Sequence, residues 1–264
     1  MKKQQVKQII LKILGFIGKT LEYILPILLI LLAWYFAGKD GDIRIKQAKF
    51  PTLAALGRKV GKLFESGKLL QNTWISLRRV LTGYVIAAAA GVSLGVIIGL
   101  SNHLERITHL LIQFIKPIPP IAWIPMVILM FGIGESGKVF LIFLGGFFII
   151  LINVMDGIRQ TDPKLLEVSK VMETPPLKNI FRVIIPSAVP NIFTGLRTGL
   201  SSCWMCVVAA ELVSSNSGLG FMISDARNYG DMAEVIVGMI TIGIIGKIMD
   251  SLLHFAEKRI IRWV

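Results

Sequence analysis

The stretch Val80–Leu104 reads VLTGYVIAAAAGVSLGVIIGLSNHL and contains no Asp, Glu, Lys or Arg. A helix needs roughly 20 mostly apolar residues to cross a hydrocarbon core about 30 Å thick, so this stretch predicts a transmembrane helix. Small residues recur every four positions along it, at Gly83, Ala87, Gly91, Gly95 and Gly99. Because a strip without large side chains lets membrane helices approach closely, we expect a packing face here. Direct contact with a substrate is the alternative.

Five more stretches with few charges lie on either side of this one, at Tyr23–Gly38, Pro117–Gly134, Val139–Met155, Pro190–Val213 and Met232–Leu252. The stretch that begins at Pro117 can extend backward over Ile107–Ile115, with only Lys116 in between. We therefore predict an all-α integral membrane protein with about six transmembrane helices.

The composition also favours a membrane protein. The 264 residues are 54% hydrophobic and 17% charged, and the mean hydropathy is +0.69. A soluble domain usually carries about 25% charged residues. The formal net charge is +13, but the basic residues flank the apolar stretches. We therefore expect a lipid bilayer and not nucleic acid as their partner, and we exclude a soluble enzyme.

The charge distribution predicts the topology. The basic N-terminus is followed by a long apolar run without a small-residue cleavage site, so we expect an uncleaved first span. With six spans, both termini are cytoplasmic. Residues 1–70 would hold an interfacial segment, the first span and an external amphipathic segment, and residues 71–264 the transmembrane core.

One segment conflicts with that topology. Residues 39–79 hold ten Lys and Arg against three acids, yet they fall on the outer side. The sequence of Gly57–Leu70 predicts an amphipathic helix that lies on the membrane surface, which lessens the conflict without removing it.

A polar segment, residues 157–189, separates the fourth and fifth predicted spans. Asp162 followed by Pro163 is an N-cap with proline at the first helical position, and Thr174 followed by Pro175 repeats that signal. These signals predict a helix–turn–helix outside the membrane.

The second helix of this segment should end at Pro186 and Pro190, before the fifth span. Both helices carry apolar residues together with basic ones, and a loop of this size between spans is usually functional. We interpret the segment as a docking site for a cytosolic partner. A loop that rests on lipid is the alternative.

Two motif matches fail in their context. Gly132–Lys138 reads GIGESGK, but Val139 replaces the Ser or Thr that a phosphate-binding loop needs for magnesium. Cys203 and Cys206 form a C-x-x-C pair within the fifth span, where we expect thiols that pack as small apolar side chains. We expect no catalytic site, metal or cofactor on this chain.

Several motifs resemble those of ABC importer permeases of the nitrate, sulfonate and taurine branch. Glu167–Ser169, Ile184–Pro186, Pro190 and Gly195–Arg197 are similar to the coupling loop of that family. The resemblance covers about residues 70–264 and continues in Ser76–Val80, Lys116–Pro125, Phe131–Glu135, Val208–Glu211, Ser217–Gly220 and Asp225–Asn228.

This resemblance implies a permease of the plasma (inner) membrane that works as a homodimer. A cytosolic ABC ATPase dimer would hold ATP and magnesium, and an external solute-binding protein would deliver a small anionic or zwitterionic solute. The segment between the fourth and fifth spans would be a cytoplasmic coupling loop. The residues carried over to it are Glu167, Val168, Ser169, Met172, Glu173, Leu177 and Pro186.

The loop departs from the family pattern at three positions. The family usually has Ala where this chain has Val168 and Ser169, and Gly where it has Glu173. If Glu173 adopts a left-handed conformation, its side chain costs roughly 1–2 kcal/mol. We expect either this strain or a turn built differently by Thr174–Pro176.

Polar residues suggest a path through the membrane. One face of the fifth span, within about 80° on a helical wheel, carries Arg197, Ser201, Trp204, Val208 and Glu211. Charges inside a span usually face a cavity or the bundle interior, so we expect this stripe to line the translocation pathway or a dimer seam. Arg197 would lie near the cytoplasmic end and Glu211 near the outer end. Alternatively, groups such as Asn153 or Asp156 of the fourth span satisfy each charge structurally.

The stretch Lys116–Pro125 contains four prolines and cannot be one regular helix. Irregular backbone at membrane depth is tolerated only against protein or a cavity. Trp123 is therefore a further candidate for the pathway, as is Asn153.

An ion-coupled secondary transporter that works without an ATPase is the alternative function. It predicts two repeated halves with buried acids near mid-membrane. The sequence shows no such repeat, and Glu211 is a single, off-centre acid. A membrane-embedded enzyme would need clustered Asp, His or Cys, which the pattern does not offer.

Overall fold

The structure, a computed structural model, describes residues 51–261 and, before them, residues 25, 26, 28, 29, 32, 34, 44, 45, 48 and 49. The predicted first span, Tyr23–Gly38, and the basic N-terminus lie largely outside the described residues.

The described chain is helical apart from one pair of short strands. Strands β1 (Arg44–Ile45) and β2 (Ala48–Lys49) pair antiparallel. The helices are α2 (Leu53–Glu65), α3 (Lys68–Leu100), α4 (Asn102–Ile115), the 3₁₀-helix η1 (Pro120–Trp123), α5 (Ile124–Phe131), α6 (Glu135–Arg159), α7 (Pro163–Val171), α8 (Pro176–Asn179), the π-helix η2 (Ile180–Ile184), α9 (Ile185–Ser214), α10 (Leu219–Asn228) and α11 (Met232–Ile260).

Four helical segments of the described chain are long and apolar enough to cross a membrane: α3, α6, α11 and the continuous stretch Pro176–Ser214. Helix α4 and the η1–α5 stretch pass this test only as a pair, and a bend of 84° separates them. The predicted third span, with its extension over Ile107–Ile115, is thus a bent pair of helices, and the break lies at the prolines after Lys116, where a regular helix was not expected. The described residues account for four or five of the six predicted spans.

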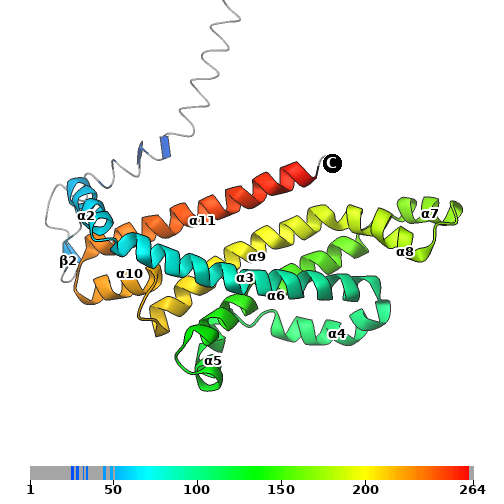
Figure 1. Cartoon of the computed structure of the whole chain (residues 1–264), viewed down its shortest axis with the longest axis horizontal. Helices are drawn as coiled ribbons and strands as arrows, with labels where there is room; N and C mark the ends of the chain where they lie inside the picture. The colour runs from blue at the N-terminus through cyan, green and yellow to red at the C-terminus, as the bar shows by residue number, and fades with distance from the viewer. Residues whose placement is uncertain are drawn as a thin grey trace, which may run out of the picture.

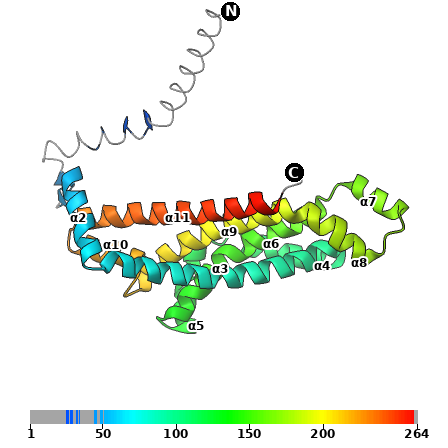
Figure 2. The same cartoon turned by 45° about the horizontal axis from the view of Figure 1, so that its top comes forward.

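The long helices lie side by side, with α7 and α8 at one end of the molecule and α2 and α10 at the other (Figures 1 and 2). We call these the α7 end and the α10 end. Helices α3 and α6 run in the same direction, since Gly83 faces Ile142 and Gly99 faces Ile158. The bent α4–α5 pair between them therefore returns the chain to the α10 end.

The glycine face of α3 is a packing face, as predicted. A Cβ atom at Gly83 would lie 2.6 Å from the side chain of Ile142, and one at Gly95 would lie 2.9 Å from the carbonyl oxygen of Leu151. Ala87, in the same strip, is fully buried. Because α6 covers the strip, it offers no surface to a substrate.

Helix α6 packs against α9 in the same close manner, but antiparallel. Gly145 of α6 lies against Cys206, and Gly157 lies against Asn191. Cys203 is fully buried, and its Sγ lies 3.2 Å from the carbonyl oxygen of Ile142. Its predicted role as a small apolar side chain is confirmed.

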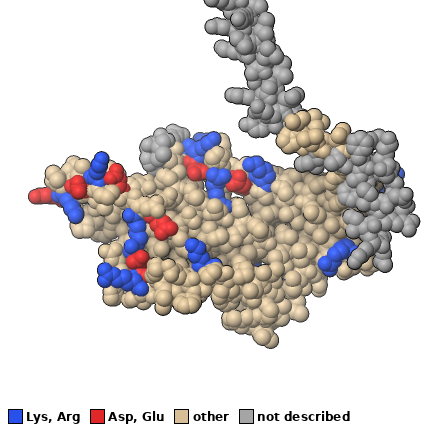
Figure 3. All heavy atoms as spheres, turned by 180° about the vertical axis from the view of Figure 1, so that it is seen from behind, with Lys and Arg blue, Asp and Glu red and all other residues tan. Residues whose placement is uncertain are grey.

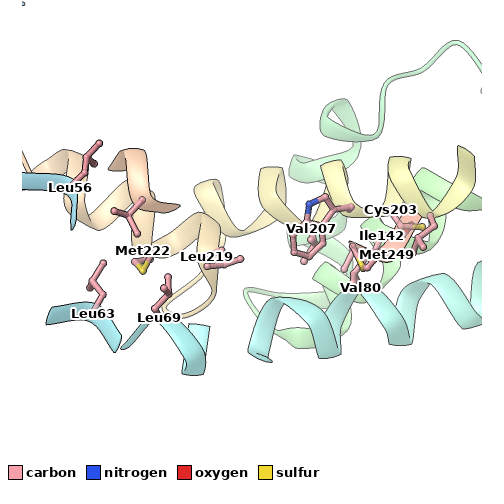
Figure 4. Packing of buried hydrophobic residues seen from close by; sticks show 13 residues of the cluster. Leu56, Leu63, Leu69, Val80, Ile142, Cys203, Val207, Leu219, Met222 and Met249 are labelled. Carbon is pink, nitrogen blue, oxygen red and sulfur yellow. The ribbon is translucent and has the colours of Figure 1, made fainter. Parts of the chain in front are cut away.

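The largest hydrophobic cluster of the described residues extends from the α10 end to the centre of this helix layer (Figure 4). Near the α10 end, Leu63 and Leu69 approach Met222, which fixes α2 and α10 to the start of α3. Nearer the centre, Val80 approaches Ile142. Helix α2 and α10 therefore belong to the same packed body as the spans.

Substitution of Gly95 by Ala should destabilise the chain by about 1–3 kcal/mol, because the new methyl group has no room against Leu151. The matched control is Gly243→Ala in α11, where no atom lies within 4 Å of the added methyl. Thermal unfolding of the detergent-solubilised protein measures both. Equal melting temperatures for the two variants would contradict the packing interpretation.

Candidate functional site

Helices α7 and α8 protrude beyond the layer of long helices (Figure 1). Helix α7 begins at Pro163, and the side chain of its N-cap Asp162 accepts the backbone N–H of Lys164. This start is as predicted. The second helix begins at Pro176, one residue later than the Thr174–Pro175 signal suggests, with Pro175 as N-cap.

The turn between the two helices is left-handed at Glu173, which has a φ of +50°. The N–H of Glu173 donates to the carbonyl oxygen of Lys170 at 3.0 Å, and the N–H of Thr174 donates to that of Ser169 at 3.1 Å. This hydrogen-bond pair is the Schellman motif, whose left-handed residue is usually Gly. The turn is therefore strained at Glu173, which was one of the two expectations for this position.

A side-chain hydrogen bond also joins the two helices. The hydroxyl of Ser169, a buried side chain, donates to Oδ1 of Asn179 at 2.9 Å. The angle between α7 and α8 is thus held by backbone and side-chain bonds together.

The outer surface of this segment carries both exposed apolar side chains and charged ones. Its exposed apolar residues are Leu165, Val168, Val171, Met172, Leu177 and Phe181, and Val171 is 83% exposed. Glu167 and Glu173 are also exposed, and Lys164, Lys170, Lys178 and Arg182 surround these side chains. Figure 3 shows charged side chains gathered at this end of the molecule. An apolar patch rimmed by charges is typical of a protein interface.

The prediction that Pro186 and Pro190 end the second helix is wrong. The helix runs without interruption from Pro176 to Ser214. The π-helix η2 lies just before Pro186, and the N–H of Ile185 bonds to the carbonyl oxygen of Ile180. The hydroxyl of Thr194 then donates to the carbonyl oxygen of Pro190 at 3.0 Å. Such local adjustments let proline persist in membrane helices.

A second polar cluster lies at the α10 end and is buried. Nη1 of Arg79 donates to Oε1 of Glu211 at 2.8 Å, and its Nε donates to Glu135 at 2.7 Å. Arg79 also donates to the carbonyl oxygen of Ser217 at 2.7 Å. Arg79 is 5% exposed and Glu211 1%. One arginine therefore ties α3 to α6, to α9 and to the loop before α10.

The loop Ser215–Gly218 is held by the same residues. The hydroxyl of Ser76 donates to Glu211 at 2.8 Å and accepts the N–H of Leu219 at 2.8 Å. Glu211 also accepts the N–H of Gly220 at 2.9 Å. A Cβ at Gly220 would lie 2.6 Å from the carbonyl oxygen of Val208. The close contact requires glycine at this position.

Several residues of this buried polar cluster belong to separate motifs of the sequence, but those motifs did not predict that the residues meet at one site. Asn72, Ser76 and Arg79 follow each other at spacings of four and three, on one face of α3. Polar residues at helical spacing are the signal that would have predicted a buried polar face.

The charged residues of the predicted stripe on α9 have partners inside the chain, and these partners are not Asn153 or Asp156. Arg197 forms ion pairs with Asp250 at 3.0 Å and Glu257 at 3.1 Å, both on α11. The side chain of Asn153 bonds to the carbonyl oxygen of Ile149 in its own helix. Arg197 and Glu211 are therefore satisfied structurally, as the alternative interpretation expected, and their partners lie on α11 and α3.

The other pathway candidates differ in how far they are exposed. The indole N–H of Trp204 donates to the carbonyl oxygen of Ile242, and the residue is 6% exposed. Ser201 is exposed on α9, and Trp123 is half-buried in η1. The five residues of the stripe thus do not form one open surface in the single chain.

Helix α2 occupies most of the predicted amphipathic segment, but Lys68–Leu70 belong to α3. Nζ of Lys59 lies 2.8 Å from Glu234, and Nζ of Lys68 lies 2.8 Å from the same carboxylate. Part of the basic excess in residues 39–79 is thus neutralised by acids near the start of α11.

Lys59 also pairs with Asp231, the N-cap of α11. Burial disfavours the charged carboxylate, but the hydrogen bonds from Lys59 and from the backbone, together with the charge of Lys59, outweigh burial and hold the pKa of Asp231 below its usual value. The ion pair therefore fixes α2 against the α10 end over the neutral pH range.

Residues 91–262 match a protein family described as the inner membrane component of binding-protein-dependent transport systems. A putative aliphatic sulfonates transport permease of Bacillus subtilis is 35% identical over 240 residues, which cover 91% of this chain and 86% of that protein. A putative ABC transporter permease of Methanocaldococcus jannaschii is 40% identical over 75% of this chain and 74% of its own length. The nitrate import permease of Leptolyngbya laminosa is 34% identical over 70% and 67%.

Two solved structures share the fold at low sequence identity. A methionine ABC transporter in inward-facing conformations has a TM-score of 0.61 and 21% identity over 75% of this chain and 96% of that chain. An amino acid ABC transporter has a TM-score of 0.64 and 14% identity over 76% and 97%.

Substitution of Glu173 by Gly should stabilise the α7–α8 turn by about 1 kcal/mol, because Gly adopts the left-handed conformation without a steric cost. Hydrogen exchange of the amides in residues 169–179 should slow accordingly. The control Glu167→Gly, inside α7, should accelerate the same exchange. Unchanged exchange in Glu173→Gly would refute the strain.

Substitution of Arg79 by Met should cost about 3–5 kcal/mol, since it leaves the buried Glu211 carboxylate without its counter-charge. Its neighbour Arg78 is exposed, so Arg78→Met should change stability by less than about 0.5 kcal/mol. Thermal unfolding measures both. Adding Glu211→Gln to Arg79→Met should recover part of the loss; no recovery would mean that packing, and not charge, dominates.

Proposed function

Because this chain belongs to the inner membrane components of binding-protein-dependent transport systems, we propose that two copies of it form the solute path of an ABC importer in the plasma membrane. A chain of this family is a transport subunit and not an enzyme, and ATP is hydrolysed on separate subunits. Nothing in the fold or among the relatives favours an ion-coupled transporter without an ATPase.

The α7 end is the cytoplasmic, ATPase-binding end in this proposal. The observation that carries it is the pair α7–α8, which presents Val168, Val171 and Leu177 to solvent on a turn fixed by hydrogen bonds. An exposed apolar surface on a rigid protruding element suits a cleft on a cytosolic partner. Glu167, Met172 and Glu173 belong to the same contact surface, whereas the half-buried Pro186 supports it from within the helix.

The orientation follows from this assignment. Helix α11 runs antiparallel to α9, because Arg197 pairs with Asp250 and Trp204 bonds to Ile242, and its C-terminus therefore points to the α7 end. The C-terminus is then cytoplasmic, as is the N-terminus if one span precedes α2. The α10 end faces outward and receives the external solute-binding protein.

The solute we propose is small and anionic or zwitterionic. Relatives are described as permeases for aliphatic sulfonates, bicarbonate and nitrate. These solutes share a compact, delocalised negative charge, and we assign the same class to this chain.

Substitution of Leu177 by Glu should abolish copurification of the ATPase subunit with the permease, because it places a charge in the apolar contact. Leu177 is 73% exposed, so the variant should fold and reach the membrane normally. Tyr229→Glu at the α10 end, where the side chain is 82% exposed, is the matched control and should retain the ATPase. If Leu177→Glu retains the ATPase as well, the coupling role of this surface fails.

A further inference from the structure

The break between α4 and η1 lies at mid-depth of the long helices. Helix α4 ends at Ile115, and Lys116 is its C-cap. A hollow of about 110 Å³ at the break is lined by Lys116, Trp123, Ser202 of α9 and residues of α6 between Leu144 and Ile152. These α6 residues lie in the middle part of the helix, at least about 10 Å from either end at 1.5 Å per residue. The ammonium of Lys116 is therefore attached far from both membrane surfaces.

Lys116 is the one charged side chain that lines this hollow, and it is exposed. A neighbouring hollow of about 260 Å³, lined by Pro120, Ser202, Met205 and Cys206 among others, has no charged residue on its wall. Ser202 and Pro120 line both hollows, so the two are adjacent along α9.

Within residues 51–261, the ammonium of Lys116 forms no ion pair and no hydrogen bond. Three cations of the long helices each have an acidic partner: Arg79 has Glu211, Lys138 has Glu135 and Arg197 has Asp250. A charge at membrane depth is costly without a partner, and such residues mark solute or ion paths.

A structural role explains less of this arrangement. A lysine at a helix C-terminus interacts favourably with the helix dipole. That interaction requires neither the hollow nor the hydroxyl of Ser202. A lysine can also extend its stem toward the membrane surface, but from mid-depth both surfaces are out of reach of its side chain.

The face of α9 beside the break is lined with hydroxyl groups. Thr194, Thr198 and Ser201 are exposed at spacings of four and three, and each hydroxyl donates to a carbonyl of its own helix. The lone pairs of these hydroxyl oxygens remain able to accept a hydrogen bond from water or a solute. The hydroxyls carry no charge, so Lys116 determines the sign of charge that the face attracts.

We propose that Lys116 selects for anions in the solute path, with Ser202 beside it as a hydrogen-bonding group. This inference rests on the proposed function and names the residue that would select the proposed class of solute. A single cation binds an oxyanion such as a sulfonate, nitrate or carboxylate without holding it tightly, as passage requires.

The native Cys206 provides a test that is independent of the solute. Cys206 lines the adjacent hollow, and its Sγ lies against Gly145, which lines the hollow of Lys116. The complex with its ATPase in proteoliposomes, during ATP turnover, is treated with the anionic 2-sulfonatoethyl or the cationic 2-(trimethylammonium)ethyl methanethiosulfonate. Modification of Cys206 is followed by mass spectrometry, with Cys206→Ala as the blank.

The anionic reagent should react faster than the cationic one in the wild type. This preference should fall about tenfold in Lys116→Met, which removes the charge but keeps a similar length, and should persist in Lys116→Arg. An unchanged preference in Lys116→Met overturns the proposal. Failure of both reagents to reach Cys206 overturns it too, because the hollows then lie off any aqueous path.

Uptake by the same proteoliposomes, with the binding protein present, separates this inference from the proposed function. The probes are ethanesulfonate, taurine, nitrate and bicarbonate. Uptake of the probe that the wild type transports should fall at least about tenfold in Lys116→Met, while this variant retains its ATPase subunit. Lys116→Arg should still transport that probe. Full uptake by Lys116→Met refutes the role of Lys116 alone. A wild-type chain that brings down no ATPase refutes the proposed function itself.

Discussion

The close contact of α6 with its two neighbours is the constraint on which the rest of the molecule depends. Helix α3 meets α6 at Gly83, Gly91, Gly95 and Gly99, and α9 meets it at Gly195 and Gly199. At these points a methyl group would meet side chains or backbone within about 3 Å. The interior of the single chain is therefore closed, since packed helices leave little space between them. In the proposed function, the solute path therefore runs along an outer face of the chain and is completed by a second copy.

The same packing sets the register of the polar contacts at both ends. Arg79 reaches Glu211 because α3 and α9 are both fixed to α6 at the α10 end. Arg197 reaches Asp250 because α11 packs antiparallel on α9. The partners of Arg79 and Arg197 are distant in the sequence, whereas Lys116 has no acidic partner within residues 51–261 and lies where the chain leaves the packed layer.

The features that depend on local sequence were predictable. The four-residue period of small residues gave the packing face of α3, and Asp162 with Pro163 gave the start of α7. At Glu173 the family pattern left two alternatives, a strained left-handed residue or a differently built turn, and the structure has the left-handed residue. These predictions hold because helix periodicity and capping are set by residues only a few positions apart.

The features that depend on tertiary register were not predictable. The partner of Glu211 is 132 positions away in the sequence, on a helix whose alignment no local pattern specifies. Pro186 and Pro190 signal a helix end in water, but here the helix continues through both, with a π-turn just before Pro186. The break at the four prolines beginning with Pro117 was predicted from the sequence, but the bend of 84° between the two helices was not.

The uninterrupted helix from Pro176 to Ser214 has a mechanical consequence. At 1.5 Å per residue its 39 residues extend about 58 Å, from the turn at Glu173 to the cluster around Glu211. A rod of this length is a lever, and tilting it by about 2° about one end moves the other end by about 2 Å. A displacement of that size is comparable to the length of the hydrogen bonds by which Glu211 holds the loop before α10. Work done on one side of the membrane can thus be delivered to the other side through a single element, without any intermediate joint.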